Sequence, residues 1–369
     1  MNIAYLANIR FPSERAHAVQ IAHMCQAFAQ AGDKVDLYVS KREDPTFEKV
    51  YQCFGFEPLF SLYTLAPYRI YIKLKFTFYT GELLFALNFL LTRKTSKYDV
   101  IYSRSEWILY LLSFFVGAHK LSWESHEAKY NFAARRILKK DIKTIVISSG
   151  IRDFYIRQGI DTEQLQVADD GVDESFFEGT VAKSDARRAL GLPQKAFIAM
   201  YVGGFDTWKG VETFFAASAL VPTATFVAIG GTSAQVGKMR EKYPKVQFLG
   251  ARSYRELVQN QQAADILVVP NTAQTMLSSS YTSPLKLFAH MASGLPLVVS
   301  DVVSITSVTG DDLVTVVEPD NLDTLAAGIM EVFQNYDEKL QKAGELKLVS
   351  KKYTWTERAK SIVEFIKNK

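Results

Sequence analysis

A pair of glycines followed by a lysine is the first group in this sequence whose residue types and spacing suit chemistry. The stretch YVGGFDTWKG covers residues 201–210, with Gly203 and Gly204 directly after an apolar run and Lys209 just before a helical pattern. Glycines let a ligand approach the backbone closely, and a lysine beside a helix start offers positive charge to an anion. One interpretation is a phosphate site. The other is a plain chain reversal in which Lys209 is a solvated surface charge.

A second segment with free backbone donors follows, and it reads YTSPLKLFAHMASGLPLVVSD over residues 281–301. Ser283 is placed to cap a helix, and Pro284 suits the first helical position. The backbone N–H groups of Leu285 and Lys286 would then be free to bind an anion. Both segments follow strand patterns, and the carboxyl ends of parallel strands meet at one edge of a sheet. The two segments therefore predict one shared anion site.

The elements that would position these segments are those of an α/β protein. Short apolar and β-branched runs alternate with helical patterns along the whole chain, which is typical of parallel sheets with crossover helices. The first series of predicted strands covers residues 2–7, 34–39, 99–102, 120–123 and 144–147, and the second covers residues 197–202, 225–229, 245–249, 265–269, 296–299 and 314–317. Helices are predicted at residues 17–30 and 356–366.

The chain is expected to form two domains, because 369 residues exceed what one hydrophobic core usually supports. A polar segment at residues 173–195 separates the two series of strands. We predict a first domain over residues 1–172, joined by a returning C-terminal helix at residues 355–369. The second domain would cover residues 173–354.

Composition excludes several classes of protein. The 43 Lys and Arg residues against 39 Asp and Glu leave a charge of +4, too even for a dedicated nucleic-acid binder. Cys25 and Cys53 are the only cysteines, and no metal-ligand spacing accompanies them, so neither disulfides nor a metal is expected. Residues 1–7 resemble a strand rather than a signal peptide, and the apolar run at 83–91 is shorter than the roughly 20 residues that cross a bilayer. A cytoplasmic protein is expected.

Several motifs, taken in order, resemble the retaining nucleotide-sugar glycosyltransferases of family four. They are PSERAHAVQIAHMCQAFAQAG, ESHE, VISSGIRD and DDGVD in the first half, and YVGG, WKG, SPLKLF, MASGLP and VVSD in the second. The resemblance covers nearly the whole chain. It implies the GT-B fold, in which two Rossmann-like domains face a cleft and the C-terminal helix crosses back to the first domain. It also implies transfer of a sugar from a nucleotide-diphosphate sugar to a glycan or lipid-linked acceptor, as in polysaccharide biosynthesis.

The same resemblance assigns roles to individual residues. Lys209 corresponds to the lysine that binds the donor diphosphate, aided by the N–H groups of Leu285 and Lys286. His126, within ESHE, corresponds to a histidine near the transferred sugar, where it could exchange a hydrogen bond at neutral pH. The alternative for His126 is a core histidine satisfied by the backbone. No metal and no cofactor beyond the donor substrate are implied.

Three positions depart from the family pattern. Gly204 stands where many members have an arginine. Tyr281 and Ala289 stand where many members have two glutamates, the second of which binds the donor's ribose hydroxyls. Three functions therefore stay open. They are an active glycosyltransferase, a glycosyltransferase-like protein or inactivated variant that binds nucleotide sugars without turnover, and another GT-B enzyme such as a sugar-nucleotide epimerase.

A basic and aromatic segment, RIYIKLKFTFYTGELLFALNFLLTRKTSK, covers residues 69–97. Such a stretch can lie on an anionic membrane surface, although two ordinary amphipathic helices with solvated lysines are the alternative. A second basic cluster consists of Arg135, Arg136, Lys139 and Lys140. A lipid-linked phosphate acceptor at the cytoplasmic face of a membrane would explain both features.

Overall fold

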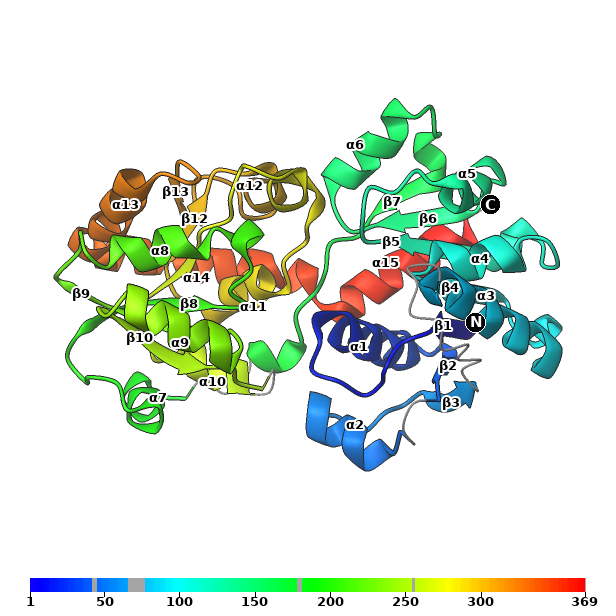
Figure 1. Cartoon of the computed structure of the whole chain (residues 1–369), viewed down its shortest axis with the longest axis horizontal. Helices are drawn as coiled ribbons and strands as arrows, with labels where there is room; N and C mark the ends of the chain where they lie inside the picture. The colour runs from blue at the N-terminus through cyan, green and yellow to red at the C-terminus, as the bar shows by residue number, and fades with distance from the viewer. Residues whose placement is uncertain (42–44, 66–76, 178–180, 254–255, 369) are drawn as a thin grey trace. The chain divides into compact units, whose positions relative to one another are not determined.

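The computed structural model describes residues 1–41, 45–65, 77–177, 181–253 and 256–368. The chain divides into two compact units (Figure 1). Unit 1 consists of Met1–Asp169 and Trp355–Lys369, and unit 2 consists of Asp170–Thr354. The division after residue 169 lies close to the position expected from the sequence, which was after residue 172.

Unit 1 is built on a parallel seven-stranded sheet with the order β3-β2-β1-β4-β5-β6-β7. Its strands are β1 (Asn2–Ala7), β2 (Lys34–Ser40), β3 (Ser61–Leu65), β4 (Val100–Ser103), β5 (Leu121–Ser125), β6 (Lys143–Val146) and β7 (Leu165–Val167). Its helices are α1 (Ala16–Gln30), α2 (Phe47–Phe54), α3 (Thr77–Thr92), α4 (Glu106–Leu112), α5 (Phe132–Lys139), α6 (Ser149–Arg157) and α15 (Trp355–Lys367). Because helices cover both faces, the central strands are buried almost throughout.

The C-terminal helix α15 belongs to unit 1, as the resemblance implies, and it packs against α1 (Figure 1). The imidazole of His23 on α1 stacks on the indole of Trp355, with ring centroids 5.7 Å apart. The α1 helix ends where Gly32 adopts a φ of 91°, a left-handed conformation that glycine reaches without strain. The helix predicted at residues 17–30 is thereby confirmed.

Unit 2 is built on a parallel six-stranded sheet with the order β10-β9-β8-β11-β12-β13. Its strands are β8 (Phe197–Val202), β9 (Ala224–Ile229), β10 (Val246–Gly250), β11 (Ile266–Val269), β12 (Leu297–Ser300) and β13 (Thr315–Val317). Its helices are α7 (Lys183–Leu190), α8 (Val211–Ala217), α9 (Ser233–Lys242), α10 (Leu257–Gln261), α11 (Leu285–Ser293), α12 (Val303–Thr309), α13 (Leu322–Gln334) and α14 (Tyr336–Ser350).

Each face of the second sheet carries its own apolar core. Along β8, Met200 and Val202 enter one buried cluster, while Tyr201 enters the cluster on the opposite face. This alternation is the period of two that a strand imposes on its side chains. Both units are therefore α/β sheets covered by helices, as the sequence predicts. All predicted strands are present, and their ends shift by at most two residues.

Candidate functional site

The Gly203–Gly204 turn brings the end of β8 against the end of β9. The N–H of Gly203 donates to the carbonyl of Ile229 at 2.9 Å. A Cβ atom at Gly230 would lie 1.9 Å from the Gly203 carbonyl oxygen, so the two backbones approach too closely for any side chain there. Gly203 itself has a φ of 151°, in the region that favours glycine. A side-chain hydrogen bond also stabilises the turn, because the Tyr201 hydroxyl donates to the Gly204 carbonyl at 2.8 Å.

Lys209 reaches back over this turn. A Cβ atom at Gly204 would lie 2.9 Å from the Lys209 Nζ atom, so the missing side chain leaves the space that the ammonium group fills. The Nζ atom pairs with the Asp206 carboxylate at 2.8 Å, and that carboxylate is half exposed. An ion pair with an exposed partner is weak, which leaves Lys209 available to a stronger anion.

Lys286, in the first turn of α11, supplies a second cation beside the first. Its Nζ atom lies 4.4 Å from the centroid of the Tyr201 ring, and it has no hydrogen-bond partner among the described residues. Burial, together with the positive charge of Lys209, lowers the pKa of Lys286 to about 7. Two lysine amines thus lie beside one glycine turn, and in their charged forms they can bind a polyvalent anion.

The predicted cap of α11 is wrong. The helix begins at Leu285, with Pro284 at the N-cap position and no side chain capping it. The Ser283 hydroxyl accepts a hydrogen bond from the backbone N–H of Asp170 at 2.8 Å instead. The Asp170 N–H is buried and needs an acceptor, so it binds the Ser283 hydroxyl oxygen, which is then not used to cap α11. The N–H groups of Leu285 and Lys286 still lie in the first turn, where they lack intrahelical partners.

Ala289 lies farther along the same helix, within the apolar cluster of unit 2 and only 1% exposed. Its carbonyl accepts from the Gln261 amide at 3.1 Å. The next residue, His290, shares that amide through Nδ1, while its Nε2 atom has no partner among the described residues. Burial and the charge of Lys286 lower the pKa of His290 to about 3, so the imidazole is neutral.

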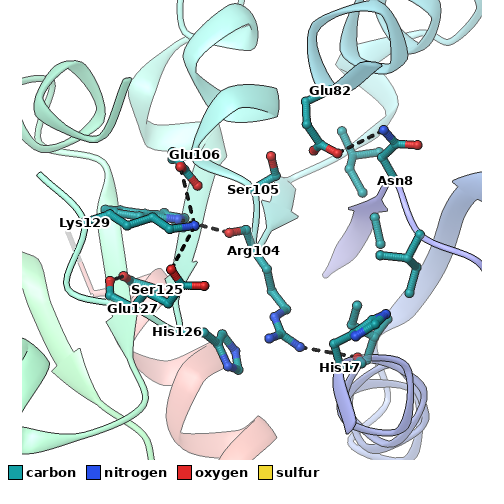
Figure 2. A pocket seen from close by; sticks show the side chains of 15 residues that line it. Asn8, His17, Glu82, Arg104, Ser105, Glu106, Ser125, His126, Glu127 and Lys129 are labelled. Atoms are coloured by element: carbon teal, nitrogen blue, oxygen red, sulfur yellow. Dashed lines mark hydrogen bonds and ion pairs between the residues drawn. The ribbon is translucent and has the colours of Figure 1, made fainter. Parts of the chain in front are cut away.

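His126 lies in unit 1, on a cavity of about 330 Å³ at the carboxyl ends of β1, β4 and β5 (Figure 2). Its Nε2 atom is 2.5 Å from the carboxylate of Glu124. Burial and the charge of Arg104 lower the pKa of His126 to about 3, so the ring is neutral. With Nε2 donating to the carboxylate, Nδ1 is the acceptor that remains. His126 can therefore accept a hydrogen bond from a sugar hydroxyl.

Glu124, which sequence reasoning did not single out, fixes this histidine. It is fully buried, and it also accepts from Gln20 at 2.5 Å and from the Tyr102 hydroxyl. The Arg358 guanidinium on α15 lies 3.3 Å away. Burial alone would raise the pKa of the Glu124 carboxyl, but the charge of Arg358 and the bond to His126 hold it well below its usual range. Glu124 is thus ionised and orients the His126 ring.

Sequence reasoning also missed most residues that line the cavity with His126. The full lining is Leu6, Ala7, Asn8, Ile9, His17, Ile21, Glu82, Arg104, Ser105, Glu106, Trp123, Ser125, His126, Glu127 and Lys129. The available signal was position, because residues 104–106 and 126–129 directly follow strands β4 and β5. No group of three or more His, Cys, Asp or Glu suited to a metal ion occurs in the part of the chain that the structure describes.

The folds of known proteins define the class of this one. The sucrose-phosphate synthase of Thermosynechococcus elongatus matches with a TM-score of 0.77 and 19% identity, covering 98% of this chain and 97% of its own. Anabaena HepE in complex with UDP-glucose matches with a TM-score of 0.76 and 16% identity, covering 99% and 98%. The lipopolysaccharide glycosyltransferase WaaG matches with a TM-score of 0.68 over the full length of both chains. The chain has the GT-B fold.

Sequence comparison matches one unit of the chain to a known family. The profile described as glycosyl transferases group 1 matches residues 196–335, which lie in unit 2. A D-inositol 3-phosphate glycosyltransferase of Corynebacterium urealyticum is 24% identical over 260 residues, which are 64% of this chain and 60% of that relative. The corresponding protein of Mycolicibacterium smegmatis is 28% identical over 42% of this chain and 38% of its own length. The chain thus spans less than two thirds of the length of these relatives.

The lowered pKa of Lys286 predicts proton uptake when a diphosphate binds. An anion beside the ammonium favours its charged form, so binding raises the pKa from about 7 toward the usual value of about 10.4. At pH 8, UDP binding should therefore take up a proton. Calorimetric titrations in two buffers of different ionisation enthalpy measure this uptake. Lys286→Met should abolish the difference between the buffers, and a wild-type heat that is independent of the buffer would contradict the assignment.

Proposed function

We propose that the protein is a retaining glycosyltransferase that moves a sugar from a nucleotide-diphosphate sugar to a glycan or lipid-linked acceptor. The observation that carries the proposal is the pair of ammonium groups, Lys209 and Lys286, at the Gly203–Gly204 turn. The solved complexes of HepE with UDP and UDP-glucose support this class of donor. WaaG, a glycosyltransferase involved in lipopolysaccharide biosynthesis, supports a role in polysaccharide synthesis.

The chemistry needs charge stabilisation more than proton transfer. The leaving group is a nucleoside diphosphate, whose negative charge grows as the glycosidic bond breaks. Fixed donors aimed at that charge lower the barrier, and a buried ammonium group does so more strongly than a solvated one. Lys209, Lys286 and the first-turn N–H groups of α11 are the donors that this mechanism uses, without a metal. His126 would accept a hydrogen bond from a sugar hydroxyl through its neutral ring.

A nucleotide-sugar-binding protein without turnover is the second candidate, and Ala289 is the observation that favours it. A methyl group within an apolar cluster cannot accept hydrogen bonds from ribose hydroxyls. Transfer and hydrolysis assays with a panel of nucleotide sugars, together with binding of the same panel, separate the candidates. Turnover supports the enzyme, binding without turnover supports the second candidate, and formation of an epimerised nucleotide sugar supports the epimerase.

Lys209→Ala should weaken nucleoside diphosphate binding by about 1.5 to 3 kcal/mol, the usual contribution of a hydrogen bond to a charged group. The ion pair with Asp206 is exposed, so its loss should leave the free energy of unfolding nearly unchanged. Calorimetric titration with UDP and GDP measures the first effect and thermal unfolding the second. Lys238→Ala, on α9 of the same unit, is the control. Unchanged affinity in the Lys209 variant would refute its role.

Peripheral contact with a membrane is the finer part of the proposal. Of the basic segment at residues 69–97, residues 69–76 lie outside the described residues, and Lys97 pairs with the buried Asp36 at 2.8 Å. The segment that follows α4 and the start of α5 offer further support, because three phenylalanines there are more than half exposed: Phe114, Phe115 and Phe132. Arg135, Arg136, Lys139 and Lys140 lie among them, without a carboxylate partner in the described part of the chain. No described helix is long and apolar enough to cross a bilayer.

Vesicle flotation tests this contact. Wild-type protein should float with anionic vesicles and remain behind with neutral ones, and the binding should fade as salt screens the attraction. Arg135→Gln with Lys139→Gln should weaken binding by roughly 2 kcal/mol, since each cation contributes about 1 kcal/mol near the surface. Arg152→Gln with Arg157→Gln removes the same charge from α6 and should have little effect. Equal flotation with anionic and neutral vesicles would count against membrane contact.

A further inference from the structure

Arg104 is a cation of the unit 1 cavity without a counter-charge. Its Nη1 atom donates to the His17 carbonyl at 3.3 Å and to the Gln20 side-chain oxygen at 3.1 Å, and both acceptors are neutral. Among the described residues no carboxylate lies within ion-pair distance of its guanidinium. Nη2 and Nε likewise have no acceptor there. The residue is half-buried, and a half-buried cation without a counter-charge leaves a place for an anion.

The nearest buried carboxylate is already committed elsewhere. Both oxygens of Glu124 are occupied, one by Gln20 and His126 and the other by Tyr102, and Arg358 supplies the matching charge at 3.3 Å. Glu124 therefore has its own counter-charge in Arg358, and Arg104 is left without one among the described residues.

The charge of Arg104 affects two histidines. Burial and the charge of Arg104 lower the pKa of His17, and the same two causes lower the pKa of His126 to about 3. Both imidazoles are consequently neutral near pH 7. They can offer hydrogen bonds, but they neither add positive charge nor compensate Arg104.

The other wall of the cavity carries carboxylates. Glu82 accepts a hydrogen bond from Asn8 at 2.9 Å (Figure 2), and Glu106 accepts one from Asn131 at 3.1 Å. Lys129, in the same wall, pairs with Glu106 at 3.7 Å and with Glu127 at 3.4 Å. Carboxylates and amides of this kind bind sugar hydroxyls, and they repel a second anionic group. The cavity of about 330 Å³ is at the small end of ligand pockets, which span roughly 300 to 1,000 Å³. It suits about one sugar ring or a polyol of that size.

We propose that this cavity binds the sugar acceptor by an anionic group, a phosphate or a carboxylate, which the guanidinium of Arg104 holds while the Glu82 and Glu106 wall binds hydroxyls. A planar guanidinium can donate two parallel hydrogen bonds to such a group, which gives direction as well as charge. The inference rests on the proposed function, because it treats the cavity as the acceptor site. Arg104 then determines specificity for an acidic acceptor over a neutral one.

The experiment compares three sugars that share a glucose ring and differ in charge, with inorganic phosphate as a competitor. Protein saturated with UDP, so that Lys209 and Lys286 are occupied, is titrated with glucose, glucose 6-phosphate, glucuronate and inorganic phosphate by calorimetry and ligand-observed NMR. We expect at least one anionic sugar to bind tenfold to a hundredfold more tightly than glucose, the range for a hydrogen bond to a charged group. Inorganic phosphate should compete with it. Whether glucose 6-phosphate or glucuronate is preferred identifies the anionic group.

Variants tie the effect to Arg104. Arg104→Gln should remove the preference for the anionic probe. Arg104→Lys should keep part of that preference, because the positive charge remains but the two parallel hydrogen bonds of the guanidinium are lost. Arg157→Gln, at an exposed position at the end of α6, should keep all of it. If Arg104→Gln does not fold, the Lys variant and competition by inorganic phosphate in the wild type decide the question.

The failures of the two proposals can be told apart. Absence of UDP binding would contradict the proposed function. If UDP binds but glucose and the anionic probes bind equally, or none of the anionic probes binds at millimolar concentration, the inference about Arg104 is overturned while the proposed function stands. Persistence of the anion preference in folded Arg104→Gln would overturn it as well.

Discussion

Replacing Glu124 by alanine should lower the free energy of unfolding by about 3 to 5 kcal/mol, the usual cost of removing one partner of a buried ion pair. Glu124 is fully buried, and its loss leaves the Arg358 guanidinium, 3% exposed, without its carboxylate. Gln20 and His126 would each lose an acceptor at 2.5 Å. Urea unfolding of the wild type and the variant measures the difference.

The pH dependence of that difference follows from the direction of the pKa shift. The folded-state pKa of Glu124 is depressed, so its contribution is present above the unfolded carboxyl pKa of about 4.3 and is lost as the pH falls below it. The gap between wild type and variant should therefore shrink in acid. Glu364→Ala, at an exposed position of α15, is the control and should change little. A Glu124 variant as stable as this control would show that the network does not hold α15.

Ala289→Glu should raise the affinity for a nucleotide sugar roughly tenfold to a hundredfold, because a carboxylate can accept from both ribose hydroxyls of the donor. The structure adds a reason of its own. Residues three apart on a helix are neighbours, and Lys286, three residues earlier on α11, has no partner among the described residues. A new carboxylate would give that ammonium a counter-charge and raise its pKa above 7. Donor titration and transfer assays of both forms measure the gain.

The opposing effect is the burial of a charge in an apolar cluster. Ala289 is 1% exposed, so a glutamate there must reach Lys286 or the ligand, or else it is left unpaired at high cost. Ala289→Ser, smaller and neutral, is the matched control for packing. Lower thermal stability with no gain in affinity would mean that the pocket is built around alanine, with His290 as its polar neighbour, and it would remove the ribose interpretation.

The local sequence pattern was enough to predict the sheets, because strands that are buried on both faces consist of continuous runs of apolar residues. The strands missed were β3 and β7, which lie at the two edges of the first sheet. β3 (Ser61–Leu65) is only partly buried, and β7 (Leu165–Val167) has three residues, so neither shows a clear run. The positions of the glycine turn and of Lys209 were also predictable, since they depend on residues only a few positions away in the sequence.

Long-range contacts set the limit of sequence reasoning at the candidate sites. The Ser283 oxygen serves the Asp170 N–H, 113 residues earlier in the chain, so its local suitability as a cap was misleading. Glu124 acquires its role from Arg358, 234 residues later. The unpaired state of Arg104 likewise depends on what Glu124 already binds. Which polar groups share a buried space is decided by the tertiary fold, and residue spacing does not carry that information.

The backbone at the two ends of unit 2 has an evolutionary consequence. Unit 2 is one uninterrupted stretch, Asp170–Thr354, and its ends adjoin, since Val172 forms a parallel bridge with Thr354 and its N–H donates to the Tyr353 carbonyl at 2.9 Å. A segment whose ends meet can be excised or exchanged without spanning a gap. The half that carries Lys209 and Lys286 is thus a cassette inserted into the other half. Recombination at two points could exchange this half, with its candidate anion site, while the gene segments that encode unit 1, including α15, stay unchanged.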